Sequence, residues 1–547
     1  MKKMPETNRV MLIGLDGATS EIIKLLVGKG RLPTFERMMK HGCFGELTSV
    51  VPPLSAPAWA SLATGKNPGK HGVYDFMTSY ISDGSLEVVI NNSGSIRGMA
   101  MWDILSNADK KVIVQNVPLT FPCYRVNGVM IAGFPSPLKG FTTYPPGLAS
   151  TLGRRHKDYS VEVTYLKSEY KGLDEEKFAR EVDILLQKHL EVTLDLLESY
   201  EWDFFMLVYS CLDRIQHMLW RYTDPSYSAT DEKAERFRGV IHHFYRRADS
   251  ILERICQRLP SDAFTIVVSD HGFEPLHSYA GLNNWLAQKG LLRVKPSSRI
   301  FSSSNVDEIY RSLYYHLNKL GLLRVIRFFP FGAGLNLLRR MKALSERIDF
   351  DESAAYSLHY GGISINDDYL RGRGEDPTKL EDFIIGELYR LKDPMTKGRL
   401  VEKIYRREEI YSGSLLERAP NLIVVFRGGC EPKRWTRGTV IEPNEWVPSK
   451  SVVSGAHHSS GALHGILLVN GPQVRHGGVK ANIVDVAPTI LHILGVPIPL
   501  DVDGRVLKEI FEEDSWYAEK EVAYQEAVGE RERIRETVRR LRGLGRF

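Results

Sequence analysis

Short, almost wholly apolar runs recur along the chain, each bounded by polar or glycine-containing turns. The clearest are Val10–Leu15, Phe204–Tyr209, 264–269 and 465–470. Apolar runs without alternation are typical of strands in a parallel sheet that is covered on both faces. Segments with helical spacing lie between them, the longest at about 175–199. The alternation predicts an α/β fold with a central, mainly parallel sheet flanked by helices.

The pattern changes after residue 290, where apolar and basic residues mix. We predict a discontinuous main domain at 8–290 and 450–510, an inserted helical cap with part of the core at 291–449, and a helical tail at 511–547. Within the insert, residues 320–342 would suit a helix on a membrane surface, but a helix packed over a core has the same pattern. We favour the packed helix, because a membrane-surface helix must expose its apolar face.

The composition is that of an ordinary globular protein, with 43% hydrophobic and 25% charged residues in 547. A net charge of +5 is small for this length and gives no reason to expect a nucleic-acid partner. The five cysteines are scattered singly, as in reduced proteins. Without a signal-peptide pattern or an apolar run long enough to span a bilayer, we expect a cytoplasmic protein.

Side chains that bind metals or transfer protons gather at the ends of four predicted strands. In open α/β sheets, ligands bind outside the carboxyl ends of the strands, so segments far apart in sequence can converge there. An isolated Asp after a strand is commonly a turn or cap residue, and the grouping is what favours a site. The residues concerned are Asp16, Asp213, His217, Asp270 and His271, with His457, His458 and His464 before the last strand.

Ser55 begins the segment Ser-Ala-Pro-Ala-Trp, which enters a predicted short helix. Serine is a common N-cap and proline is tolerated in a first turn, so by itself the segment predicts a capped helix. Beside a metal site, the same hydroxyl would be a nucleophile. Asp213 and His217 are spaced i to i+4, which places both on one helical face where they can bind one ion, although an ordinary surface pair has the same spacing.

Three carboxylates, at least three imidazoles and a hydroxyl can hold two divalent ions. Mixed nitrogen and oxygen ligands suit zinc or manganese better than calcium. Two ions beside a hydroxyl form a clamp for in-line displacement at phosphorus. The start of the Ser55 helix would favour the anionic phosphoryl group.

These motifs, in this order, resemble the alkaline phosphatase superfamily, in particular its type I phosphodiesterase/nucleotide pyrophosphatase branch and a subgroup of predicted phosphohydrolases and phosphomutases. The resemblance implies a metal-dependent phosphohydrolase that cleaves phosphodiester or phosphomonoester bonds through a phosphoserine. The ligands it implies are Asp16, Ser55, Asp270 and His271 for one ion, and Asp213, His217 and a late histidine for the other. Gly455-Ala456-His457 best matches the late Gly-x-His motif; His464 is the alternative and His458 the third choice.

Two rival interpretations remain beside this one, and a third branch of the superfamily is disfavoured. Sulfatases carry an arginine where Trp59 stands, which argues against that branch. A phosphomutase would return the phosphoryl group from Ser55 to the substrate, and a cap that excludes water would help it. A non-catalytic binding protein could use the same scaffold. We expect a small phosphorylated substrate and two ions, with Zn²⁺ first and Mn²⁺ second.

Overall fold

The structure, a computed structural model, describes residues 8–82, 85–137, 140–163, 174–224, 232–295, 347–394, 397–436, 438–444 and 453–527. The amphipathic segment 320–342 and the end of the predicted tail, 528–547, lie outside these ranges. Among the helices that the structure does describe, none combines the length and the apolar composition needed to cross a bilayer.

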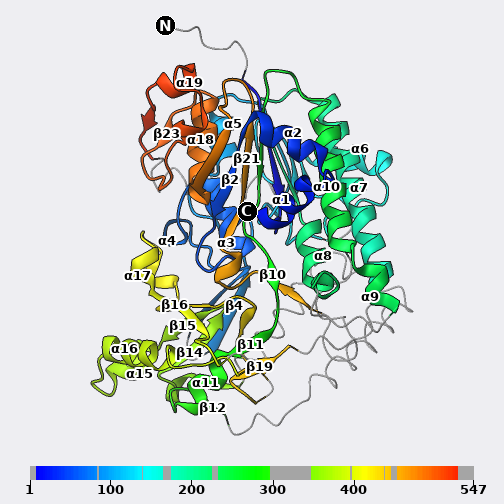
Figure 1. The fold of residues 1–547 in the computed structure, drawn as a ribbon. Coiled ribbons are helices and arrows are strands. Elements are labelled where there is room, and N and C mark those ends of the chain that lie inside the picture. The colour runs from blue at the N-terminus through cyan, green and yellow to red at the C-terminus, as the bar shows by residue number, and fades with distance from the viewer. Residues whose placement is uncertain are drawn as a thin grey trace, which may run out of the picture.

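A nine-stranded sheet forms the centre of the described main domain (Figure 1). Strand β1 lies parallel between β8 and β9, and β5 and β6 continue the parallel part beyond β8. On the other side, β21 runs antiparallel to both β9 and β2, and β22 is parallel to β2. The order is β22 (Gly477–Asn482), β2 (Cys43–Thr48), β21 (His464–Asn470), β9 (Phe264–Val268), β1 (Val10–Leu15), β8 (Phe204–Tyr209), β5 (Val112–Val117), β6 (Gly128–Ala132) and β7 (Thr143–Tyr144).

Helices cover both faces of this sheet, and each face has its own apolar core. Alternate residues of β1 enter the two cores: Leu12 packs into one and Ile13 into the other, both fully buried. This double burial explains why the strands read as continuous apolar runs. It confirms the predicted α/β fold. One face carries α3 (Ser55–Thr64), α5 (Met101–Asn107) and α18 (Val486–Ile493); the other carries α1 (Ser20–Gly28), α2 (Pro33–His41), α6 (Pro146–Arg155), α7 (Glu175–Ser199), α8 (Cys211–Leu219) and α10 (Val240–Cys256).

The described part of the insert has a third core of its own. It contains a four-stranded antiparallel sheet as well as helices, and it recruits Met77 and Trp285 from outside residues 291–449. Figure 1 shows this unit below the main sheet. Its elements are β14 (Ala355–His359), β15 (Gly362–Ile365), β17 (Leu422–Phe426), β16 (Val401–Arg406), α11 (Leu282–Gln288), α15 (Asp367–Arg371) and α16 (Pro377–Leu388).

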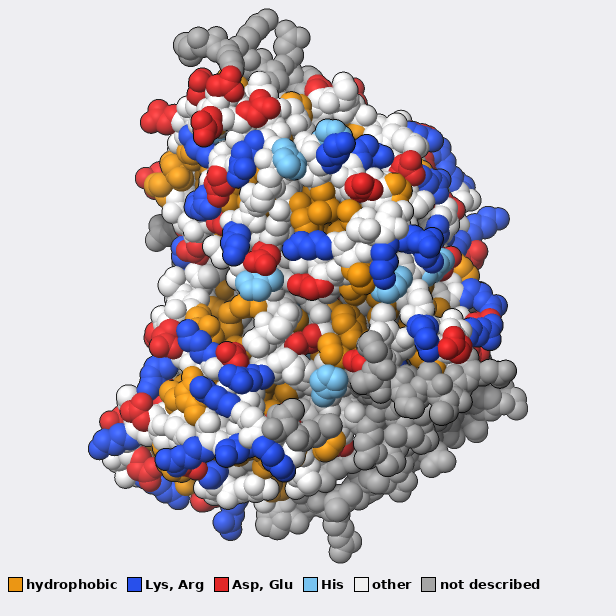
Figure 2. All heavy atoms as spheres, viewed as in Figure 1, with side chains coloured by type: hydrophobic (Ala, Val, Ile, Leu, Met, Phe, Trp, Pro, Cys, Tyr) orange, Lys and Arg blue, Asp and Glu red, His pale blue; other side chains and the backbone are white. Residues whose placement is uncertain are grey.

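All five cysteines are free thiols. Figure 2 shows Lys and Arg side chains interspersed with Asp and Glu on the visible face.

Shorter elements connect the main sheet and the insert. The remaining elements are α4 (Pro68–His71), β3 (Met77–Ser82), β4 (Ser85–Ile90), α9 (Glu232–Phe237), β10 (Glu274–Pro275), β11 (Ser278–Gly281), β12 (Arg293–Val294), β13 (Ile348–Asp349), α17 (Arg407–Ile410), β18 (Cys430–Lys433), β19 (Ile441–Pro443), β20 (Gly455–Ala456), β23 (Ile498–Pro499), α19 (Trp516–Glu519) and β24 (Tyr524–Gln525).

Helix α3 packs onto β1 through a tryptophan that only a glycine can accommodate. The Trp59 ring is 1% exposed and lies against Gly14 of β1, and its Nε1 donates a hydrogen bond to Asp16 Oδ2 at 3.2 Å. A Cβ at Gly14 would overlap this ring and would lie 2.9 Å from Val208 Cγ2. Gly14 therefore fixes how closely α3 approaches the end of β1.

We expect Gly14→Ala to lower the free energy of unfolding by about 1–3 kcal/mol, because the new methyl group overpacks a closed core. Urea denaturation measures this change. Gly28→Ala is the matched control, since a Cβ there meets nothing within 4 Å. Equal stability of the two variants would show that α3 is free to shift.

Glu274 of β10 is largely enclosed where the main sheet meets the insert. Its Oε1 has no hydrogen-bond partner, and its Oε2 lies close to Gly428 and Gly461. Burial raises the pKa of this carboxyl from 4.5 to about 7, against a smaller lowering by a hydrogen bond from the Gly429 backbone. The folded protein therefore holds the Glu274 proton more tightly than the unfolded chain does.

This shift predicts that Glu274 contributes stability below about pH 4.5 and loses it as the pH rises through about 7. The loss amounts to about 3 kcal/mol. Glu274→Gln should remove it, so the variant gains stability relative to the wild type between pH 5 and pH 8. Denaturation curves across that range measure the difference, and a constant difference would contradict the prediction.

Candidate metal centre

The carboxylates of the candidate site stand where parallel strands end. Asp16 follows β1, Asp213 lies in the first turn of α8 after β8, and Asp270 follows β9 after one residue. Because β8, β1 and β9 are parallel neighbours in register, their carboxyl ends meet at one edge. All three residues are almost completely buried, at 5% exposure or less.

Ser55 is the first residue of α3, but it is not the helix cap. The N-cap is Leu54, and no side chain caps this helix, so the prediction of a capping serine is wrong. The Ser55 hydroxyl instead lies 3.1 Å from His271 Nε2. The helix start delivers this hydroxyl to the edge where the carboxylates meet.

One group of side chains surrounds the Nε2 atom of His271. This atom lies 3.1 Å from Ser55 Oγ, 3.3 Å from Asp270 Oδ2 and 3.5 Å from Asp16 Oδ1. Four potential ligand atoms from two strand ends and one helix start thus face one another. The structure brings together all four residues that the sequence assigns to a first ion.

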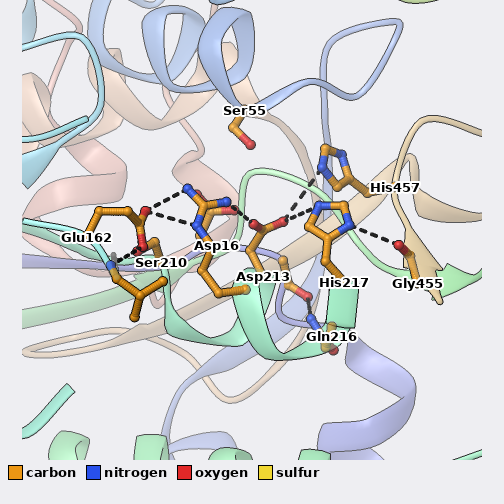
Figure 3. Close-up of polar contacts among 12 residues, drawn as sticks. Asp16, Ser55, Glu162, Ser210, Asp213, Gln216, His217, Gly455 and His457 are labelled. Atoms are coloured by element: carbon orange, nitrogen blue, oxygen red, sulfur yellow. Dashed lines mark hydrogen bonds and ion pairs between the residues drawn. The ribbon is translucent and has the colours of Figure 1, made fainter. Parts of the chain in front are cut away.

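A second group surrounds Asp213. Its Oδ1 lies 3.2 Å from His217 Nε2, on the same helix, and 3.6 Å from His457 Nε2 (Figure 3). The two groups are in contact, because the rings of His271 and His457 stack with their centroids 3.7 Å apart. Asp213, His271 and His457 also form a compact cluster of possible ligand atoms, so the two groups share one space.

Backbone carbonyls fix the orientation of all three imidazoles. Nδ1 of His217 donates to Gly455 O, Nδ1 of His457 to Pro53 O, and Nδ1 of His271 to Gly272 O, each at 2.9 Å. A carbonyl oxygen only accepts, so Nδ1 carries the proton and Nε2 of a neutral ring has a lone pair. Burial and the neighbouring imidazoles hold the pKa of His457 well below its usual value, so this ring is neutral. Lone pairs facing carboxylates repel unless a cation lies between them.

Buried carboxylate oxygens without hydrogen-bond partners also indicate that the site needs a cation. Asp16 Oδ1, Asp213 Oδ1 and both oxygens of Asp270 are buried and have no hydrogen-bond partner of acceptable geometry. Burial, and then the neighbouring carboxylates, raise the pKa values of Asp16 and Asp270. Burial also acts to raise the pKa of Asp213, but His217 and Arg214 outweigh it, and the pKa of Asp213 is lowered. Buried charges of this kind are paired or coordinate metals, so the residues fit two divalent ions.

The other two histidine candidates do not face Asp213 or Asp270. His464 is exposed at the start of β21, with its Nδ1 3.3 Å from Thr48 Oγ1. His458 adjoins the site but stacks on Tyr360, and its Nδ1 lies 3.6 Å from Glu431 Oε1. The geometry therefore favours His457 as the late ligand, and ligation by this set of residues stays a prediction.

Sequence reasoning missed two charged residues beside the centre. Arg214 Nη1 donates to Asp213 Oδ2 at 2.5 Å, and Arg214 Nε and Nη2 donate to Glu162 Oε2 at 2.9 and 2.6 Å. Arg214 has one sequence signal, since it directly follows Asp213. Glu162 has none, because it lies in a loop 52 residues from its partner.

Comparison with known proteins finds a matching family model and similar folds. A family model described as type I phosphodiesterase/nucleotide pyrophosphatase matches residues 10–438. No curated protein sequence matches the chain closely.

The fold is similar to those of two solved hydrolases. Phosphonoacetate hydrolase from Sinorhizobium meliloti 1021, in complex with phosphonoacetate, is 15% identical with a TM-score of 0.51, covering 90% of this chain and 96% of that one. Wild-type alkaline phosphatase PafA is 13% identical with a TM-score of 0.53, covering 93% and 100%. At these identities the likeness shows the fold.

We expect the protein to bind two divalent ions per chain and His457→Ala to retain one. His464→Ala, the matched control, should retain both, because its side chain lies outside the two groups. Metal analysis after gel filtration counts the ions, and thermal denaturation with and without a chelator follows their effect. Each ion present at 100 times its dissociation constant adds about 2.7 kcal/mol of stability. If His464→Ala lost an ion and His457→Ala kept both, the assignment of His457 as the late ligand would be wrong.

Proposed function

We propose that this chain, which belongs to the type I phosphodiesterase/nucleotide pyrophosphatase family, is a metal-dependent hydrolase of phosphate esters that works through a phosphoserine at Ser55. The observation that carries the proposal is the position of the Ser55 hydroxyl, 3.1 Å from an imidazole nitrogen that two buried carboxylates also face. A serine hydroxyl at its ordinary pKa is a weak nucleophile, so it needs an adjacent base or a bound metal ion to activate it.

The two groups of side chains divide the work between nucleophile and leaving group. Asp16, Asp270 and His271 would hold one ion beside Ser55, and Asp213, His217 and His457 would hold the other. When bound, two such ions supply Lewis acidity at both oxygens of an in-line displacement. Zinc is the ion we expect, and manganese suits the same mixture of imidazole and carboxylate.

Ser55 supplies the oxygen that attacks phosphorus. Its Oγ gives up its proton to solvent and forms a bond to phosphorus. The bond from phosphorus to the ester oxygen breaks, and that oxygen takes a proton from solvent and leaves as an alcohol. Water then attacks the phosphoserine, releases phosphate and restores the hydroxyl. The N-terminal turn of α3, where Ser55 stands, offers backbone N–H groups and a positive dipole end to the anionic phosphoryl group.

We expect Ser55→Ala to lower kcat/KM for phosphate esters by more than about 10³-fold while the fold and bound metal persist. The physical reason is the loss of the only oxygen that forms the covalent intermediate. Release of alcohol and of inorganic phosphate, measured with metal-loaded protein, gives the rate. Mass spectrometry of acid-quenched wild type should find phosphate on Ser55.

Ser61→Ala is a matched control in the same helix. Ser61 Oγ lies 2.9 Å from His71 Nε2, but that pair lies outside the metal groups. Its activity should stay close to that of the wild type. Full activity of Ser55→Ala would remove Ser55 from the mechanism, and isomerised product without free phosphate would favour a phosphomutase instead.

A further inference from the structure

A small cavity opens beside Ser55, on the side that carries Arg214. Its volume is about 40 Å³, and both Ser55 and Asp16 contribute to its lining. This volume holds roughly three water-sized groups. The cavity is therefore large enough for oxygens of a phosphoryl group, which would occupy most of it.

Arg214 gives the cavity a positively charged donor held in a fixed position. Glu162, which is 1% exposed on its side chain, accepts two of its N–H bonds, and Asp213 accepts a third. A guanidinium has five N–H donors, so two remain for a ligand. Figure 3 shows Glu162 and Asp213 joined through this contact, with Ser55 beside them.

Asn116, a residue with a strained backbone conformation, contributes a second hydrogen-bond donor. It stands at the end of β5 with φ of 57°, a left-handed conformation that is costly for most residues and is found at functional sites. The Tyr159 hydroxyl donates to Asn116 Oδ1. The group that Asn116 can offer inside the cavity is therefore its amide nitrogen.

His189 supplies a buried acceptor. Its ring is 1% exposed and lines the cavity, its Nε2 donates to Ser160 O at 2.8 Å, and its Nδ1 has no hydrogen-bond partner. A water held by this nitrogen would have a hydrogen left to donate to a phosphoryl oxygen. The cavity is thus lined by polar groups that can bind a ligand: the guanidinium of Arg214, the amide of Asn116 and Nδ1 of His189.

Two aromatic rings close the remaining side. Phe76 and Phe134 pack edge to face, with ring centroids 5.3 Å apart, and both line the cavity. Because in-line attack places three oxygens around phosphorus, the two oxygens that point away from the metal groups need space next to Ser55. In a diester, one of these two oxygens carries a second organic group, which these rings would exclude.

We infer that this cavity receives the free phosphoryl oxygens of a phosphomonoester, and that Arg214 and Asn116 are the residues that select monoesters over diesters. The inference rests on the proposed function and narrows its substrate class. A monoester presents two unsubstituted oxygens and more negative charge to the Arg214 guanidinium, whereas a diester presents one oxygen and one bulky group.

The test compares p-nitrophenyl phosphate with methyl p-nitrophenyl phosphate, which share a leaving group and differ only by one methyl ester. We expect metal-loaded wild type to have the higher kcat/KM for the monoester. Arg214→Ala should lower this value by about 10- to 100-fold, because it removes a charged hydrogen bond to the phosphoryl group. It should change kcat/KM for the methyl ester much less. Phe134→Ala should raise kcat/KM for the methyl ester relative to that for the monoester, because it removes one of the two aromatic rings that line the cavity.

Two further variants guard against indirect effects. Asn116→Gly removes the amide but keeps the left-handed backbone accessible, and it should lower the monoester rate selectively. Arg247→Ala is the matched control, because Arg247 is also 28% exposed and donates to a carboxylate, Asp183, at 2.6 Å. It should leave both rates unchanged. Metal content is measured for each variant, since Arg214 also contacts Asp213.

Binding of inorganic phosphate to metal-loaded protein, measured by calorimetry, gives a readout apart from turnover. Arg214→Ala should weaken it by about 10- to 100-fold at equal metal content. Faster cleavage of the methyl ester by wild type, or an equal loss on both esters in Arg214→Ala, would overturn the monoester assignment and leave the hydrolase standing. Failure of loaded wild type to cleave either ester would overturn both.

Discussion

Mutual repulsion among buried carboxylates is the constraint on which the rest of the centre depends. The parallel strands β8, β1 and β9 end side by side, which forces Asp213, Asp16 and Asp270 into one almost dry space. Isolated ionised carboxylates are costly there, and one guanidinium, from Arg214, cannot neutralise three of them. Folding therefore creates a demand for cations that the protein's own described side chains only partly meet, and that demand makes the site a candidate metal centre.

The imidazoles serve this centre only because their proton positions are fixed. Three backbone carbonyls hold the Nδ1 protons of His217, His271 and His457, and so direct three lone pairs inward. One of these carbonyls belongs to Gly455, where a Cβ would lie 2.5 Å from Gln216 O. The glycine lets β20 approach α8 closely enough for the bond, so loop packing sets the chemistry of the ring.

The sequence was sufficient for the features that depend on local pattern. Strands buried on both faces have to be apolar throughout, and the polar residues after them have to gather at one edge, so the sheet and the residues gathered at the site were predictable. The path of a loop leaves no such pattern. The sequence could not show that Ser55 does not cap its helix or that Glu162 pairs with Arg214, because each depends on contacts between distant segments. It favoured His457 over His464 by a motif, but the contact of His457 with Asp213 appears only in the structure.

The proposed nucleophile and the residues proposed to select the substrate lie in different parts of the fold. Ser55 and Trp59 lie one helical turn apart on α3, so one face of the helix directs the hydroxyl to His271 and the indole to Asp16. Core packing of Trp59 against β1 therefore ties the nucleophile to a candidate ligand as one rigid unit. The cavity beside it is lined in part by connecting segments outside the sheet, which carry Phe134 and Glu162. Such segments can change without disturbing the sheet, so the reacting groups can stay fixed while the choice of substrate varies.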